Sequence, residues 1–342
     1  MLDNDALPFN VRAAVTGAKY SSQSLSNDLM HGKECLKTLI ERIGHEHVEL
    51  RLQTEREHEA QLFGQGTLIF NLENLYLAPF VIEFGLKLTG LYGVARRNAE
   101  RVLIKRNLIR SASLPRSFDG FTMLHVSDLH GDTSLGAMGH LADITRDLVY
   151  DICVLTGDYR GKTYGSFEKS LEAIAPVMAS LKQPIFAVLG NHDSILMTPA
   201  LEAMGAKVLF NETEVIARGN DQIYLAGIDD AHFYRVGDIG KAAHAIPVNT
   251  YSILLSHTPE VYREAAHRGF DLMLSGHTHG GQLCLPYGVP IKLEAKLPRR
   301  LGSGAWRYGH MAGYTSTGAG TSLLPVRLNC PAEVTLHTLR QG

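Results

Sequence analysis

The chain of 342 residues is poor in cysteine, with four such residues in all. Cys35, Cys153, Cys284 and Cys330 are far apart, and no two of them form a Cys-x-x-Cys pair. Zinc ribbons depend on such pairs, and small secreted folds depend on closely spaced cysteines for their disulfides. The cysteine content therefore argues against both classes and favours a reducing compartment.

The chain also lacks a pronounced charge of either sign. Its formal net charge is -2 and its pI is near 6.8, which gives no reason to expect a nucleic-acid partner. The first thirty residues contain no basic segment followed by an apolar one, so a secretory signal is not expected. We therefore expect a cytoplasmic protein, and its oligomeric state is left open.

No apolar run in the N-terminal third is both long enough and free enough of charged residues to span a membrane. Apolar residues recur there at steps of three and four, which predicts one apolar helical face, at Leu77, Val81, Phe84, Leu88 and Leu91. Glu83 and Lys87 lie off that face, whereas a spanning helix needs about 20 mostly apolar residues. The segment either lies on a membrane surface or docks on the rest of the chain.

A basic stretch follows directly, and we expect it to continue as a helix. Its members are Arg96, Arg97, Arg101, Lys105, Arg106, Arg110 and Arg116, opposed by Glu100 and Asp119. A basic helix after an apolar face is typical of segments attracted to anionic headgroups, at roughly 1 kcal/mol per basic residue. Two interpretations stay open for residues 77–110: peripheral contact with an anionic membrane, or plain docking with a solvated basic flank.

The chain divides near residue 116. Residues 1–65 are polar and predict an exposed helix over 36–52, so residues 1–116 form a helical N-terminal extension. From 117 to 342, short apolar runs alternate with helix-length segments at 138–149 and 167–182; the runs cover 121–126, 151–155, 184–189, 207–210, 223–226, 251–255 and 272–274. This alternation predicts an α/β domain, a sandwich with a two-layered β-sheet core flanked by helices.

Five polar blocks follow these strand-like runs. They are Asp128-Leu129-His130, Gly157-Asp158, Gly190-Asn191-His192-Asp193, Ser256-His257 and Gly276-His277-Thr278-His279. Open α/β sheets place their ligands at the carboxyl ends of strands, where loops from neighbouring strands converge. The blocks are therefore predicted to gather carboxylates, imidazoles and an amide at one site. That mixture suits manganese, iron or zinc better than a metal that prefers thiolates.

In order and type the blocks resemble those of the calcineurin-like metallophosphoesterases, over residues 121–339. The resemblance implies that fold and a pair of divalent metals, for which manganese is favoured over iron or zinc. Two cations about 3.5–4 Å apart polarise a phosphoryl group and lower the pKa of a shared water. The implied ligands are Asp128, His130 and His279 for one metal, Asn191, His257 and His277 for the other, and Asp158 as the bridge.

Three further residues beside the ligands have an implied or possible role. His192 resembles the histidine of the family that faces the substrate, so it is the expected catalytic residue, and imidazole suits general-acid work near neutral pH. Asp193 either orients His192 or supports the ligands from behind. Arg160 either reaches a substrate phosphate or is an exposed loop arginine. The run from Gly157 to Gly161 lacks the second aspartate of the protein phosphatase branch, so that branch is not expected.

Two stretches narrow the resemblance. Residues 276–282 with Leu285-Pro286, and residues 318–327 with the later Cys330-Pro331-Ala332-Glu333, are similar to a bacterial branch of membrane-associated phosphodiesterases. That branch includes UDP-2,3-diacylglucosamine pyrophosphatases. We therefore expect hydrolysis of a phosphodiester or pyrophosphate bond in a lipid-linked substrate, at the inner face of a membrane. The alternatives are a soluble phosphodiesterase for cyclic nucleotides or nucleic-acid ends and a non-catalytic scaffold, which the filled ligand positions disfavour.

Overall fold

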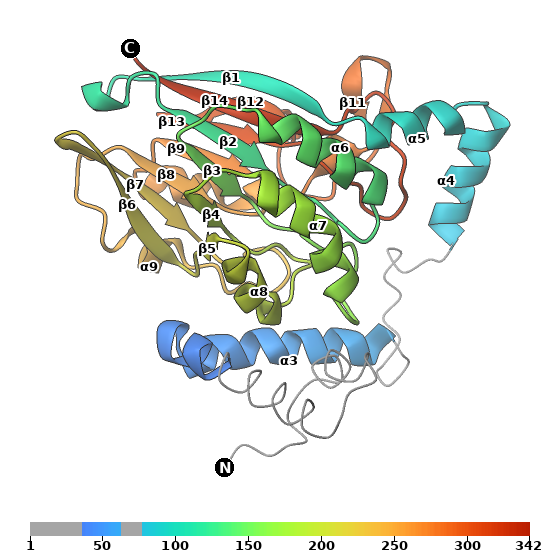
Figure 1. Ribbon diagram of the computed structural model, residues 1–342, viewed down its shortest axis with the longest axis horizontal. Helices are drawn as coiled ribbons and strands as arrows, with labels where there is room; N and C mark the ends of the chain where they lie inside the picture. Colours follow the sequence, from blue (N-terminus) through green and yellow to red (C-terminus); the bar gives the residue numbers. More distant parts are fainter. Residues whose placement is uncertain (1–35, 63–76) are drawn as a thin grey trace.

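Two six-stranded sheets pack face to face in the computed structural model, which describes residues 36–62 and 77–342 (Figure 1). The first sheet has the order β1-β14-β2-β3-β4-β5, with β1 (Leu103–Ser111), β14 (Glu333–Gln341), β2 (Thr122–Val126), β3 (Ile152–Leu155), β4 (Ile185–Ala187) and β5 (Ala206–Val208). The second has the order β12-β13-β9-β8-β7-β6, with β12 (Gly304–Tyr308), β13 (Met311–Thr315), β9 (Leu272–Ser275), β8 (Ser252–Leu255), β7 (Asp221–Gly227) and β6 (Glu212–Arg218). A small hairpin joins β10 (Cys284–Leu285) to β11 (Val289–Pro290).

The strands next to the predicted site run parallel. In the first sheet β2, β3, β4 and β5 are parallel neighbours, and β14 runs antiparallel to β2. In the second sheet β7, β8, β9 and β13 are parallel, while the edge strands β6 and β12 are antiparallel to their neighbours. The carboxyl ends of the parallel strands of each sheet therefore share one edge.

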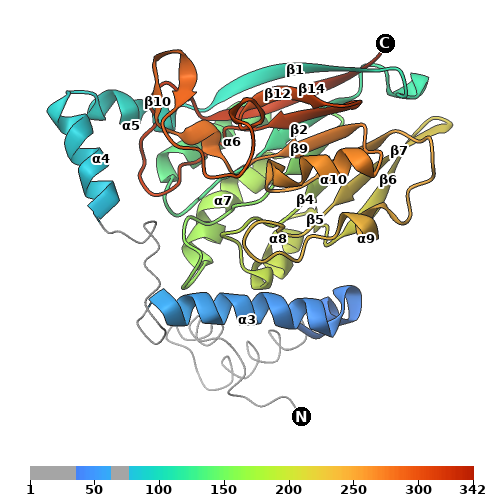
Figure 2. The same cartoon turned by 180° about the vertical axis from the view of Figure 1, so that it is seen from behind.

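Helices cover the outer face of each sheet. The first sheet carries α6 (Leu135–Arg146), α7 (Glu168–Ser180) and α8 (Thr198–Ala203), and the second carries α9 (Ile239–Ala243) and α10 (Tyr262–His267), as the two views show (Figures 1 and 2). Val154 and Phe186 of the first sheet share the central core with Leu225 and Ile253 of the second. The predicted α/β sandwich with a two-layered sheet core and flanking helices is confirmed.

The N-terminal helices are packed against this body. Residues 36–43 are helical, Gly44 interrupts the helix with a φ of 96°, and α3 (His45–Leu62) follows. The expected exposure holds for one face only, at His45 and Glu46. The apolar positions join the core beside the first sheet, at Leu39, Ile43, Val48 and Leu52. The expectations for residues 1–35, including the missing secretory signal, and for 63–76 lie outside the described residues.

The basic stretch is only partly helical. After α4 (Leu77–Leu88) and α5 (Tyr92–Glu100) the chain enters β1, which pairs in parallel with β14 from Leu103 opposite Glu333. The expected basic helix is therefore wrong beyond α5, because residues 103–111 form an edge strand along which more exposed and less exposed side chains alternate. The division at residue 116 stays a prediction, although β1 lies before it and belongs to the first sheet. Within 36–62 and 77–342, no helix combines the length and apolarity that crossing a membrane demands.

Candidate metal centre

The five polar blocks meet at the shared edge of the two sheets. Each block follows the end of a strand: Asp128 and His130 follow β2, Asp158 follows β3, Asn191 follows β4, His257 follows β8, and His277 with His279 follows β9. All seven side chains that the sequence predicts as ligands take part in two contiguous groups of close contacts. The six carboxylate and imidazole residues among them are buried, with exposed fractions of 7% or less.

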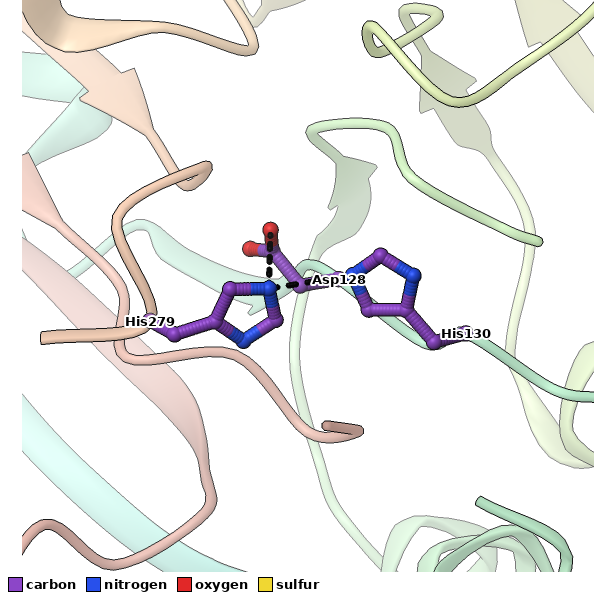
Figure 3. Close-up of side chains that lie close together, drawn as sticks. All are labelled: Asp128, His130 and His279. Atoms are coloured by element: carbon purple, nitrogen blue, oxygen red, sulfur yellow. Dashed lines mark hydrogen bonds and ion pairs between the residues drawn. The ribbon is translucent and has the colours of Figure 1, made fainter. Parts of the chain in front are cut away.

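The first group consists of Asp128, His130 and His279 (Figure 3). Nε2 of His279 lies 3.0 Å from Nε2 of His130 and 3.5 Å from Oδ1 of Asp128. Nδ1 of His130 donates to the carbonyl oxygen of Arg160 at 2.8 Å, so the hydrogen of the neutral ring is on Nδ1. Nε2 then presents a lone pair to the same point as the other two groups, which is how a backbone carbonyl orients a metal-binding histidine.

The second group consists of Asn191, His257 and His277. Oδ1 of Asn191 lies 2.9 Å from Nε2 of His257 and 2.8 Å from Nδ1 of His277. Nδ1 of His257 donates to the carbonyl oxygen of Thr156 at 2.7 Å, which again leaves Nε2 directed at the group. Three atoms that carry lone pairs thus crowd one point, and they repel one another unless a cation or a proton lies between them.

Asp158 lies between the two groups. Its Oδ2 is 3.2 Å from Nε2 of His257 in the second group and 3.6 Å from Nε2 of His130 in the first. Ligand atoms of Asp128, Asp158 and His257 also lie within 4.8 Å of one another. A single carboxylate is therefore within reach of both groups, which is the position that a bridging ligand needs.

The electrostatics of the site favour added positive charge. Burial raises the pKa of Asp128 to about 7, and the nearby charge of Asp158 adds to the effect. Burial opposes a charge on His257, yet Asp158 and Asp128 outweigh it and raise the pKa of its imidazole to about 10. Two buried carboxylates, four imidazoles and an amide oxygen fit divalent cations with mixed oxygen and nitrogen preference.

The backbone at the ligands is strained. Five ligand positions have a left-handed backbone although none is glycine: Asp128 (φ 53°), His130 (41°), Asp158 (59°), His277 (71°) and His279 (50°). Such a conformation costs roughly 1–2 kcal/mol per residue, and strain of this kind gathers at functional sites. A Cβ on Gly190 would overlap the carboxylate of Asp158, and one on Gly276 would overlap that of Asp128. The sharp turns after the strands thus bring the ligands together.

Asp193 holds the loops that carry these ligands. Its buried carboxylate accepts the backbone N–H groups of Asp158 at 2.7 Å, of Tyr159 at 2.8 Å and of Gly190 at 2.8 Å. Asp193 was expected either to orient His192 or to support the ligands. Its contacts correspond to the second role, because the carboxylate accepts hydrogen bonds from the backbone of the ligand loops.

His192 lies beside the ligand groups and is partly exposed. Its ring meets the edge of the His130 ring, with centroids 5.2 Å apart, and its Nδ1 is 3.4 Å from Oγ1 of Thr163. Its backbone N–H donates to Oδ1 of Asp158 at 2.9 Å. The side chain is thus next to the candidate metals and open to a ligand, as a residue facing a substrate would be.

Arg160 is buried, with an exposed fraction of 1%, so the expectation of an exposed loop arginine is wrong. Its guanidinium donates to the carbonyl oxygen of His192, to that of Gly165 at 3.0 Å and to that of Thr163 at 3.2 Å. A contact with a substrate phosphate would require some of these bonds to open. Substrate binding by Arg160 stays a prediction.

Helix α3 reaches the same site, which the sequence did not indicate. Glu55 accepts a hydrogen bond from Oγ of Ser194 at 2.7 Å, and Arg51 donates to the carbonyl oxygen of Asp193 at 3.2 Å. Oδ2 of Asp229 lies 2.7 Å from Nε2 of His47 and 3.6 Å from Nε of Arg51. The charged residues of α3 gave no local signal, because their partners are more than a hundred residues away in the chain.

Arg327 is a second residue at the site that the sequence did not indicate. It is fully buried and donates to the carbonyl oxygens of Thr317 at 2.6 Å and Gly318 at 3.1 Å. Its Nη2 lies 3.4 Å from Nδ1 of His279. The arginine therefore braces the loop behind the first group, and its position in the 318–327 stretch was the only signal for it.

The match to known proteins begins at β2, the strand that precedes Asp128. Residues 121–281 match the family described as Calcineurin-like phosphoesterase, and they contain all five blocks. Phosphodiesterase YaeI of Escherichia coli (strain K12) is 34% identical over 64% of this chain and 82% of its own length. This chain belongs to the calcineurin-like phosphoesterase family. The expected enzyme class, a metal-dependent phosphoesterase, is confirmed.

Other proteins named for a metallophosphoesterase match similar lengths of the chain. The uncharacterized metallophosphoesterase YkoQ of Bacillus subtilis (strain 168) is 27% identical over 80% of this chain and 99% of its own length. A protein of Danio rerio named as a transmembrane protein with metallophosphoesterase domain is 28% identical over 67% of this chain and 55% of its own length. The dinuclear metal dependence of the family agrees with the two ligand groups around Asp158.

Proposed function

We propose that the protein is a two-metal phosphodiesterase or pyrophosphatase that acts on a lipid-linked substrate at the inner face of a membrane. The observation that carries the hydrolytic part is the position of Asp158 between two ligand groups, with His192 free beside them. Two divalent cations, manganese in our proposal with iron or zinc as alternatives, would polarise the phosphoryl group and lower the pKa of a shared water.

The residues divide into three roles in this proposal. Those that hold one metal are Asp128, His130 and His279, and those that hold the other are Asn191, His257 and His277. Asp158 contacts both groups and fixes their separation. His192 belongs to neither group, so its imidazole is free to give a proton to the leaving oxygen of the substrate.

The lipid part of the proposal rests on α4. One side of this helix packs on the body through Leu86, which shares a small apolar cluster with Val326. The other side is apolar yet between 67% and 76% exposed, at Phe80, Val81, Phe84 and Leu88. Figure 1 shows α4 projecting from the body, joined to it through α5. An exposed apolar patch of this kind is typical of an interaction site.

The charge next to this patch supports a lipid as the partner. Arg96 and Arg97 of α5 are exposed and follow α4 directly in the chain. An apolar helical face flanked by basic residues is the pattern of helices that lie in the headgroup region of anionic membranes. We therefore favour a substrate of the UDP-2,3-diacylglucosamine class, whose acyl chains would be anchored in the same membrane.

A substrate screen tests the hydrolytic and lipid parts together. The manganese-loaded protein is incubated with a UDP-linked diacylated sugar, with cyclic nucleotides and with linear nucleotides, and the products are measured by mass spectrometry. We expect cleavage of the lipid pyrophosphate, none in Asp158→Ala, and about 100-fold or greater loss of rate in His192→Ala. Cleavage of nucleotides alone would replace the lipid proposal with the soluble alternative. No cleavage of any substrate would refute the hydrolytic proposal.

Vesicle sedimentation tests the membrane contact separately. We expect binding to vesicles rich in phosphatidylglycerol and weak binding to pure phosphatidylcholine. The double change Phe84→Glu with Leu88→Glu on α4 should abolish it. The matched control is Val149→Glu with Val248→Glu, because these two residues are also exposed apolar side chains but belong to the segments before β3 and β8. Equal binding of vesicles by both double variants would refute the proposal that α4 contacts the membrane.

A further inference from the structure

A second histidine, His232, lies at the opposite end of the ligand groups from His192. The ring of His192 meets His130 of the first group, whereas the ring of His232 lies against His277 of the second, with centroids 4.4 Å apart. His232 belongs to the loop that follows β7, which is a parallel strand of the second sheet. It therefore occupies the same end-of-strand position as the predicted ligands.

The orientation of the His232 ring is fixed by Glu260. Nδ1 of His232 lies 2.6 Å from Oε2 of Glu260, and the carboxylate accepts the hydrogen bond. Glu260 is three residues beyond His257, so the pair is tied to the second ligand group. In the part of the chain that the structure describes, Nε2 of His232 has no bonded protein partner. That nitrogen, on the far edge of the ring from Glu260, is available to a ligand.

The backbone of His232 is also held in place. The buried carboxylate of Asp230 accepts the N–H groups of His232 at 3.2 Å, Phe233 at 2.6 Å and Tyr234 at 2.7 Å. Three bonds from consecutive residues to one side chain leave this loop little freedom. A histidine placed by two carboxylates, one on its backbone and one on its ring, is a preorganised group.

His232 is also more exposed to solvent than the predicted carboxylate and imidazole ligands. The carboxylate and imidazole ligands are at most 7% exposed, whereas the side chain of His232 is 34% exposed. Asn191 and His192 are the other partly exposed side chains in contact with the ligand groups. The partly exposed histidines thus flank the ligand groups, with His192 beside the first group and His232 beside the second.

We propose that His232, held by Glu260, is a second substrate-binding histidine, which contacts an oxygen of the phosphoryl group from the side opposite His192. This inference rests on the proposed function, because it takes the ligand of the site to be a phosphate ester. With its Nδ1–H donated to Glu260, an imidazole ring that carries both protons donates its Nε2–H to a phosphate oxygen in a defined direction. His192 then remains the residue next to the leaving oxygen.

The substitution His232→Phe separates this role from a packing role. Phenylalanine keeps a ring against His277 but has no nitrogen, so metal binding should stay at two ions per chain. We expect inorganic phosphate to bind the manganese-loaded variant about tenfold or more weakly by calorimetry, with a similar rise in KM for bis-p-nitrophenyl phosphate. His232→Gln, which restores an amide nitrogen, should recover part of the affinity. His310→Phe is the matched control, since His310 is exposed in the β12–β13 turn.

Two results would overturn the inference. Unchanged phosphate affinity and KM in His232→Phe would mean that His232 does not contact the substrate. Loss of bound metal in that variant would mean that it only supports His277. If the wild-type protein hydrolyses no phosphate ester, the proposed function fails. The phosphate-binding comparison between wild type and His232→Phe still decides the role of His232 in that case.

Discussion

The carboxylate of Asp193 accepts the backbone N–H of Asp158 at 2.7 Å, so a side chain after β4 holds the ligand that follows β3. The same carboxylate accepts the N–H of Gly190, directly before the Asn191 ligand, at 2.8 Å. Two neighbouring strand ends are thus joined by one buried side chain. The spacing of the two candidate ligand groups therefore depends on a buried carboxylate that belongs to neither group.

Removal of the Asp193 carboxylate should therefore weaken metal binding. Asp193→Ala leaves several buried N–H groups without an acceptor, and we expect manganese affinity to fall about 10–100-fold. Asp193→Asn keeps one acceptor oxygen and should lose less. Metal titration by calorimetry measures both variants. Wild-type affinity in Asp193→Ala would show that the loops keep their place without this carboxylate.

The buried ion pair between Arg51 and Asp229 should hold α3 on the site. Both side chains are fully buried, and the Arg51 guanidinium lies 3.6 Å from the centroid of the Tyr234 ring. Arg51→Met leaves the charge of Asp229 without this partner, and we expect the free energy of unfolding to drop by about 3 kcal/mol.

Urea unfolding measures that loss, and an exposed pair on the preceding helix supplies the control. Lys37 and Glu41 are 3.7 Å apart with side chains 75% and 66% exposed, so Lys37→Met should change stability by less than about 0.5 kcal/mol. Asp229→Asn in the Arg51→Met background should recover part of the loss. Similar effects of Arg51→Met and Lys37→Met would contradict the prediction.

Metal loading should stabilise the folded protein. The carboxylates of Asp128 and Asp158 are buried close together, and a bound cation removes their repulsion. A metal at about a thousand times its Kd adds roughly 4 kcal/mol to the free energy of unfolding. We expect Tm to fall after chelation and to return with manganese. Asp158→Ala, which lacks the shared ligand, should show a much smaller return, and an identical one would contradict the bridging role.

Two buried histidines away from the ligands should make the protein acid-sensitive. Burial lowers the pKa of His125 to about 3, and burial next to His125 lowers that of His337 as well. Below the ordinary value of about 6.5 the unfolded chain takes up protons that the folded chain excludes. Stability should therefore fall as the pH drops from about 6.5, by about 1.4 kcal/mol per pH unit for each histidine.

The double variant His125→Gln with His337→Gln isolates this contribution. Urea unfolding of metal-free protein between about pH 6 and pH 4 should show a shallower dependence on pH than wild type, by the slope given above for each histidine removed. The exposed His310→Gln should leave the slope unchanged. An unchanged slope in the double variant would mean that both histidines are protonated in the folded state.

Much of the site was predictable because its signals are local. Strand-like apolar runs mark β2, β3, β4, β8 and β9, and the polar block after each run marks a strand end. Parallel strands bring such ends together whatever their separation in the chain. The same rule applies to β7, which ends at Gly227. It predicts that the loop after this strand, which carries Asp229, Asp230 and His232, also lies at the site. His232 was thus within reach of the sequence.

Two other features of the structure could not be predicted from the sequence, because they depend on contacts between residues that are far apart in the chain. Along β1 the basic residues looked like the continuation of a helix, and only the pairing of Leu103 with Glu333 makes the segment a strand. Arg51 looked like a solvated helix residue, and only Asp229 and Tyr234 make it a buried one. Contacts between residues more than a hundred positions apart leave no local pattern to interpret.

The place of β14 between β1 and β2 has a consequence for biosynthesis. β2 emerges from the ribosome long before β14, and until then its free edge has no partner on that side. Sequence-distant pairings of this kind form slowly, and an open strand edge invites association with other chains. The ribosome must therefore translate at least as far as Thr338 before β14 can pair with β2. A nascent chain that stalls earlier is exposed to aggregation and is a natural client for chaperones.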